Sequence, residues 1–281
     1  MSIVLREGTV VLHDEINSSP AALLLTSGDL AKSEYIRFLF MLWHIYDTLE
    51  RALFEHREHP VIFHIYHPRV FSRATALSFD ICHLLDTVTW QTDPSYVAFF
   101  NDIPAPVQEY CDRIAYLGRV DAPEEDVNLL ASHAYVRYLG DLSGGQIIRK
   151  KIIKAYNLYD DGDGIAFYTF RTLDPRTGDR AAVPHEIRKI KDWFKAGLDE
   201  SVTDPAVKVA IVEETKRGFI YNSEMFKCLD GAKSLSTEPL PKPSALVEFL
   251  TSNTGTTIGG IVALLLAAIL SRSILSMAGR S

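Results

Sequence analysis

Several features common in enzymes and secreted proteins are missing from this sequence of 281 residues, and each absence narrows its function. The three cysteines, Cys82, Cys111 and Cys228, are widely spaced and form no CxxC pair, which suits a reducing compartment and excludes a CxxC metal site. No Gly-x-x-x-x-Gly-Lys-Ser/Thr loop is present, which excludes a P-loop nucleotide site. The formal net charge of −7 argues against nucleic acid as a partner.

The N-terminus also lacks an apolar run, because Arg6, Glu7 and His13 interrupt it, and we therefore expect no signal peptide. The C-terminus is different. Residues 256–270 carry no charge, and with residues 271–278 the segment reaches the ~20 residues needed to cross a bilayer. Arg272 is close enough to the end of the segment to reach the interface. The sequence predicts a transmembrane tail anchor over residues 256–278.

A linker separates this segment from the rest of the chain. Residues 233–255 include Pro239, Pro241 and Pro243 among serines and lysines, a composition typical of a semi-extended connection. Residues 1–232 are expected to form one globular domain, since 47% of the whole chain is hydrophobic and 23% is charged.

Helical periodicity dominates this domain. Tyr35, Phe38, Leu39, Leu42 and Tyr46 recur at the spacing of one face of a helix that runs to about residue 56. Asp204 followed by Pro205 predicts the start of a last long helix that continues to about residue 229. Prolines bracket residues 61–66, the only strand-like run, which favours a connector. The predicted fold class is all-α.

The most informative stretch runs from His133 to Gln146. Apolar residues on both sides have helical spacing and predict one long helix over about residues 125–158. Yet Gly140, Gly144 and Gly145 fall inside it, each costing roughly 1 kcal/mol relative to alanine. Two interpretations remain open from the residues alone. A flat ligand lies against bare backbone at a kink, or another helix packs closely on Gly140 and Gly144.

This stretch, with its Gly-Asp-Leu-Ser-Gly-Gly sequence, resembles the signature of the haem oxygenase family. The resemblance extends to residues 44–50, 164–167 and 205–226, and covers roughly residues 5–230. It implies a single helical haem oxygenase-like domain that opens haem to biliverdin, carbon monoxide and ferrous iron. Haem b is then both substrate and cofactor, and molecular oxygen and electrons from NADPH, delivered by a cytochrome reductase, are required.

The resemblance also assigns the residues that hold haem. His13, on a short helix over residues 9–17 and facing inward, is implied as the axial iron ligand. Asn17 stands where the family usually has a glutamate that accepts the other ring N–H, so the iron's axial bond is expected to be more weakly tuned. The full set of implied haem contacts is Arg6, His13, Tyr135, Gly140, Ser143, Gly144, Lys191, Lys195 and Phe219.

Arg188, Lys191 and Lys195 share one helix face, which on sequence alone is either a solvated basic surface or an anion site. The resemblance implies that Lys191 and Lys195, with Arg6, bind the haem propionates. One lysine of the family's usual set is Val10 here, so one such contact is expected to be lost.

On the opposite side of the haem, Arg137 and Asp141 are four residues apart on the helix and can join one hydrogen-bonded network. The resemblance implies a catalytic set of Asp141, Arg137, Tyr46 and Asn222, with ordered water held by Asp141. Phe167, Phe219 and Phe226 are either walls of the haem pocket or ordinary core residues.

The expected protein is a tail-anchored haem oxygenase, of a eukaryotic and fungal type, on the cytosolic face of the endoplasmic reticulum membrane. The alternative is a haem-binding sensor or buffer that does not degrade haem. It would need His13 and the basic cluster but would tolerate loss of the catalytic set. A membrane-tethered helical scaffold without haem is a third interpretation, which a missing haem absorbance after addition of hemin would favour.

Overall fold

The structure is a computed structural model that describes residues 1–160 and 162–229, and every regular element in these ranges is helical. The predicted all-α fold is therefore confirmed for these residues. None of the helices described is long and apolar enough to cross a membrane. The predicted linker 233–255 and membrane segment 256–278 lie outside the described ranges.

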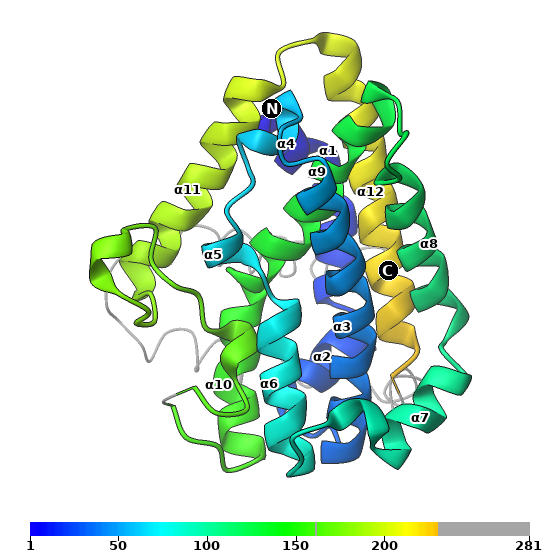
Figure 1. The fold of residues 1–281 in the computed structure, drawn as a ribbon, viewed down its shortest axis with the longest axis vertical. Helices are drawn as coiled ribbons and strands as arrows, with labels where there is room; N and C mark the ends of the chain where they lie inside the picture. The colour runs from blue at the N-terminus through cyan, green and yellow to red at the C-terminus, as the bar shows by residue number, and fades with distance from the viewer. Residues whose placement is uncertain (161, 230–281) are drawn as a thin grey trace, which may run out of the picture. The chain divides into compact units, whose positions relative to one another are not determined.

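Twelve α-helices and three short 3-10 helices follow one another along the described chain (Figure 1). They are α1 Ser2–Asn17, α2 Pro20–Ser27, α3 Lys32–Glu55, α4 Pro60–Phe63, α5 Pro68–Phe71, α6 Ala74–Leu85, η1 Trp90–Thr92, α7 Pro94–Asn101, α8 Ala105–Leu117, α9 Glu124–Asp141, α10 Gly144–Ala155, η2 Ala166–Tyr168, η3 Pro175–Thr177, α11 Pro184–Ser201 and α12 Pro205–Lys227.

The predicted helix boundaries hold where capping chemistry defines them. The Asp204 carboxylate accepts hydrogen bonds from the backbone N–H groups of Ala206 and Val207, and Pro205 occupies the first turn of α12. α3 ends at Glu55, as its periodicity indicates. Residues 61–66 contain the end of α4 and a turn, so the run is a connector and not a strand. α1 begins earlier than expected, at Ser2.

The expected single helix over residues 125–158 is wrong, because the chain breaks between α9 and α10. Ser143 leaves helical geometry with φ −117° and ψ −89°. The Gln146 amide bridges the break by donating to the carbonyls of Asp141 (3.1 Å) and Tyr168 (2.9 Å). Glycine's low helix propensity on both sides of Ser143 explains why the helix stops here.

Helix α9 lies at the centre of the packing and contacts α3, α8 and α12, while α1 packs against α12 (Figure 1). The core of α3 and α9 is apolar and aromatic, with Tyr46, Leu49 and Leu130 fully buried. At Gly197, α11 passes so close to α4 that an added Cβ would lie 2.2 Å from the His64 carbonyl oxygen. This close crossing fixes the position of α11, which carries Lys191 and Lys195.

Candidate functional site

Four polar side chains predicted as a catalytic set form one continuous network. Tyr46 on α3 donates its hydroxyl proton to Asp141 Oδ2 on α9. Arg137 Nε donates to the Tyr46 hydroxyl at 3.2 Å, and Arg137 Nη1 donates to Asn222 Oδ1 on α12. Arg137 and Asp141 are thus linked through Tyr46, and no ion pair between them is found in the described chain. Three helices hold the set together.

The Asp141 carboxyl group is a weaker acid than an exposed aspartate. Burial raises the pKa of its carboxyl group to about 6, although the charges of Arg137 and Arg73 and the hydrogen bond from Tyr46 act in the opposite direction. A carboxyl group in this range exchanges a proton readily near neutral pH. Asp141 can therefore hold a proton or an ordered water next to the break between α9 and α10.

A second buried cluster, one turn earlier on α9, fixes that helix to its neighbours. His133 Nε2 lies 3.1 Å from Glu214 Oε1 on α12, and Arg113 on α8 makes two hydrogen bonds to the same carboxylate, at 2.8 and 2.9 Å. Burial acts to raise the pKa of Glu214, but the hydrogen bonds from Arg113 and His133 outweigh it and lower the pKa to about 2. The cluster sets the register of α9 against α12, and so the position of Arg137 relative to Asn222.

The glycines at the helix break decide between the two sequence interpretations. Gly140, Ser143 and Gly144 are exposed, while Asp141, Leu142 and Gly145 between and after them are buried. An added Cβ would meet nothing within 4 Å at Gly140 or Gly144. Among the described residues, no helix packs on these two glycines, so their surface is open for a ligand. Gly145 faces inward, where a Cβ would lie 3.2 Å from the Tyr168 ring.

His13 lies on α1, and the edge of its ring faces the ring of Phe219 on α12 at a centroid distance of 6.2 Å. Its side chain is 52% exposed, and the contact with Phe219 places the ring against α12. The Asn17 amide donates from Nδ2 to His13 Nδ1 at 3.1 Å, while Asp14 Oδ1 is 3.4 Å from the same nitrogen. Rotation of the Asn17 amide by half a turn would instead let its oxygen accept from Nδ1–H.

The predicted cations surround the same surface. Lys191 Nζ on α11 is 3.4 Å from Ser143 Oγ. The pKa of Lys191 is lowered by burial and by the positive charges of Lys195 and Arg188. Arg6 on α1 is near enough to Tyr135 on α9 for its charge to lower that phenol's pKa, against the larger effect of burial. None of Arg6, Lys191 and Lys195 forms an ion pair within the described ranges, which leaves them available to an anionic ligand.

The three phenylalanines differ in burial. Phe167 is buried with its ring 5.5 Å from that of Tyr46, and Phe226 is partly buried and packs on Phe38 at 6.0 Å, whereas Phe219 faces His13. Sequence reasoning missed Gln146, which joins the helix break to η2. Its place two residues after Gly144 is the only sequence signal for that role.

A family model described as heme oxygenase matches residues 1–228. Heme oxygenase 1 of Homo sapiens is 31% identical over 227 residues, which cover 81% of this chain and 70% of that protein. A solved structure of heme oxygenase from Leptospira interrogans has 33% identity and a TM-score of 0.65, and covers 80% of this chain and 98% of that one. Heme oxygenase-1 from the cyanobacterium Synechocystis, solved in complex with heme, has 29% identity and a TM-score of 0.67, covering 89% of this chain and 97% of that one.

Proposed function

Because this chain belongs to the haem oxygenase family, we propose that it opens haem b to biliverdin, carbon monoxide and ferrous iron. The enzyme consumes molecular oxygen and electrons that derive from NADPH and arrive through a reductase. Haem is the substrate and, while bound, also supplies the iron at which oxygen is reduced. The chain supplies the binding surface, the orientation of the substrate and the protons.

The residues present fit a flat, dianionic macrocycle with an iron centre. Gly140 and Gly144 offer backbone without side chains, and nothing covers the positions of their missing Cβ atoms. His13 offers an exposed ring nitrogen, and a neutral imidazole is a common ligand of haem iron. Lys191, Lys195 and Arg6 would hold the propionates, with Tyr135, Ser143 and Phe219 completing the contact surface.

One observation carries the assignment to an enzyme: the hydrogen-bonded set Asn222–Arg137–Tyr46–Asp141. Arg137 and Tyr46 hold the Asp141 carboxyl in one orientation, so a water bound to it is placed beside Gly140. Burial keeps that carboxyl partly protonated near neutral pH. Asp141 can therefore deliver a proton repeatedly at one fixed position. Gly140 and Gly144 admit the substrate close to the backbone, where the bound substrate would exclude bulk water.

A haem sensor or buffer is the rival function. Such a protein needs the axial histidine and the cations but has no use for a buried acid held by three helices. Burying Arg137 and Asp141 costs free energy that hydrogen bonds must offset. A protein that only stores haem gains nothing from that cost, and the catalytic assignment is favoured.

Hemin conversion by the full chain in detergent tests the proposal. A stoichiometric hemin complex, supplied with oxygen and ascorbate as the electron source, should yield biliverdin and carbon monoxide. The rival function predicts a stable complex whose absorbance persists under the same conditions. The same assay with NADPH and a cytochrome reductase tests whether the electrons come by that route.

We also propose that residues 256–278 anchor the protein in the endoplasmic reticulum membrane with residues 1–232 in the cytosol. The support is the uncharged apolar sequence of 256–270 and the proline-containing linker before it. Deleting residues 256–281 should move the protein to the soluble fraction and leave hemin conversion intact. A truncated protein that still sediments with membranes would contradict the anchor.

A further inference from the structure

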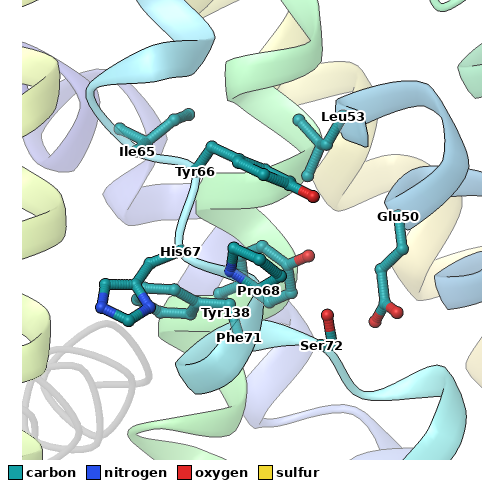
Figure 2. Close-up of a pocket in the computed structure, with 9 residues that line it drawn as sticks. All are labelled: Glu50, Leu53, Ile65, Tyr66, His67, Pro68, Phe71, Ser72 and Tyr138. Atoms are coloured by element: carbon teal, nitrogen blue, oxygen red, sulfur yellow. The ribbon is translucent and has the colours of Figure 1, made fainter. Parts of the chain in front are cut away.

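Helix α11 is fixed to its neighbours in its C-terminal half. It packs there on the segment that contains α4 and α5, and Figure 2 shows His67 and Phe71 on this segment. The centroid of the Trp193 ring on α11 lies 5.5 Å from that of His67 and 5.8 Å from that of Phe71. At Gly197, an added Cβ would lie 2.2 Å from the His64 carbonyl oxygen. The end of α11 therefore cannot shift without moving this segment.

Asp199, two residues after Gly197, joins this fixed end of α11 to the start of α1. Its Oδ1 accepts a hydrogen bond from the Ser2 backbone N–H at 2.6 Å, and its Oδ2 accepts from the Ser2 hydroxyl at 2.7 Å. Oδ1 also accepts from the Met1 nitrogen at 2.6 Å. Burial acts to raise the pKa of Asp199, but the hydrogen bonds from Met1 and Ser2 outweigh it and lower the pKa. A carboxylate of α11 thus caps α1, and we call the Ser2–Asp199 contact the clasp.

Helix α1 has few other fixed points. Among the described residues, Ser2 makes the only hydrogen bonds that join α1 to another helix. Near its middle, α1 passes so close to α12 that a Cβ added at Gly8 would lie 2.9 Å from Val212 Cγ1. Closer to its end, the ring of His13 faces the ring of Phe219. The clasp and the close contact at Gly8 therefore define how α1 is inclined.

Gly8 lies between the clasp and the proposed iron ligand. Ser2 is six residues before Gly8, and His13 is five residues after it. At about 1.5 Å per residue, the two arms of the helix are about 9 Å and about 7.5 Å long. When a rigid helix tilts about a point near its middle, its two ends move by similar amounts in opposite directions. A displacement of Ser2 would therefore displace His13 by a similar amount.

The clasp lies on the same helix faces as the proposed haem contacts. The shared faces carry Lys191, Lys195 and Asp199 at intervals of four residues on α11, and Ser2, Arg6 and His13 at intervals of four and seven on α1. Residues at such intervals lie on one side of a helix. The clasp thus joins at one end the face of α1 that carries the iron ligand and the face of α11 that carries two cations, Lys191 and Lys195.

We propose that the Ser2–Asp199 clasp sets the tilt of α1 about Gly8, and with it the distance from His13 to the two cations of α11. Haem is a rigid ring that carries its iron and its propionates at a fixed separation, so it can bind through both only where this distance matches. Asp199 is a positioning residue, since it acts through α1 and does not touch the substrate. The inference rests on the proposed function, because it requires haem as the ligand.

The chain offers variants on both sides of the clasp and a matched control. Asp199→Ala removes the acceptor, Ser2→Ala removes the hydroxyl donor, and Ser2→Thr keeps a hydroxyl group. The control is Asp204→Ala. The Asp204 carboxylate caps α12 by accepting from the N–H groups of Ala206 (2.7 Å) and Val207 (3.1 Å), and this cap does not involve α1. Asp204→Ala therefore removes an exposed helix cap of the same chemistry without touching the clasp.

The experiment compares the release of hemin and of hemin dimethyl ester, whose propionates are uncharged, from the full chain in detergent to an excess of a haem-scavenging protein. In Asp199→Ala, hemin should be released about fivefold faster than from wild type, as expected for loss of a helix cap that binding requires. Release of the ester should be unchanged, because the ester does not depend on the cations. Ser2→Ala should act in the same direction and add little to Asp199→Ala, whereas Ser2→Thr and Asp204→Ala should keep the wild-type rates.

Hydrogen exchange of the ligand-free chain gives a readout without haem. The backbone N–H groups of residues 9–13 should stay protected in Asp199→Ala, because the clasp positions α1 and does not form it. Equal acceleration of hemin and ester release, or loss of this protection, would show that Asp199 only stabilises the helix and would overturn the proposal. An unchanged rate of hemin release in Asp199→Ala would overturn it as well.

Failure of the proposed function has a different signature. A wild-type chain that binds hemin without converting it, supplied with ascorbate and oxygen, contradicts the enzyme assignment while the effect of Asp199→Ala on hemin release still decides the role of the clasp. A wild-type chain that binds no hemin contradicts both proposals.

Discussion

The two sides of the proposed haem site are built in different ways. On the side of Asp141, four side chains from α3, α9 and α12 are hydrogen-bonded to one another, and all but Asn222 are buried. On the side of His13, the proposed iron ligand is half-exposed on α1, and the nearby cations have no carboxylate partners in the described chain. The residues proposed to deliver protons are thus held by one another, whereas the residues proposed to bind haem present polar groups at the surface.

Asp141→Ala should have the largest effect, because it should impair biliverdin formation while leaving hemin binding intact. The variant should bind hemin with unchanged stoichiometry, because His13, Lys191 and Lys195 remain. Removal of a positioned acid should lower the biliverdin yield of a single turnover by about a hundredfold. With peroxide, the variant should oxidise peroxidase substrates better than wild type. A normal biliverdin yield would remove Asp141 from the mechanism and leave the glycine backbone alone to direct the chemistry.

Glu214→Gln tests whether the buried cluster with Arg113 and His133 stabilises the packing of α9 on α12. Breaking a buried ion pair of this kind should lower the free energy of unfolding by about 3 kcal/mol. The pKa of Glu214 is lowered to about 2, so the wild-type stabilisation is present above the ordinary value of 4.5 and is lost as the pH falls toward 2. Denaturant unfolding at neutral and acidic pH measures this. An equal loss at both would contradict the electrostatic origin.

Gly140→Ala should raise the stability of the ligand-free protein but lower its affinity for hemin. An added Cβ meets nothing within 4 Å, so helix propensity should raise the stability of the ligand-free protein by about 1 kcal/mol. The methyl group would occupy the open surface and should lower hemin affinity by about tenfold. Gly145→Ala is the control: its Cβ would crowd Tyr168, so the ligand-free protein should be destabilised. Unchanged hemin affinity in Gly140→Ala would place the haem elsewhere.

Asn17→Glu should have the smallest effect. It tests whether the side chain at position 17 contacts His13 in the haem complex. A carboxylate accepts the His13 ring N–H more strongly than an amide and increases the electron density that reaches the iron. The iron–histidine stretching frequency of the ferrous complex should rise, while stability should change by no more than about 0.5 kcal/mol. An unchanged frequency would show that Asn17 does not contact His13 in the complex.

The sequence predicted the elements well where local chemistry determines them. Asp204 and Pro205 define the start of α12, and apolar spacing defines α3. The sequence suggested a kink at the glycines but not a full break at Ser143, because the apolar spacing continues through it. Glycine propensity and the Gln146 bridge to η2 interrupt the helix there.

The site was predicted through the family resemblance, which gave its residues but not their connections. Tyr46 stands between Arg137 and Asp141 because α3 packs on α9, and spacing within α9 suggested a more direct pairing.

Resonance Raman spectroscopy of the ferrous haem complex identifies the residue that binds the iron. If His13 is the axial ligand, wild type should show an iron–histidine band that is lost in His13→Ala and returns when imidazole is added. His133 cannot replace it, being fully buried against Glu214. An unaltered band in His13→Ala would move the ligand to another histidine and contradict a haem bound between α1 and the junction of α9 and α10.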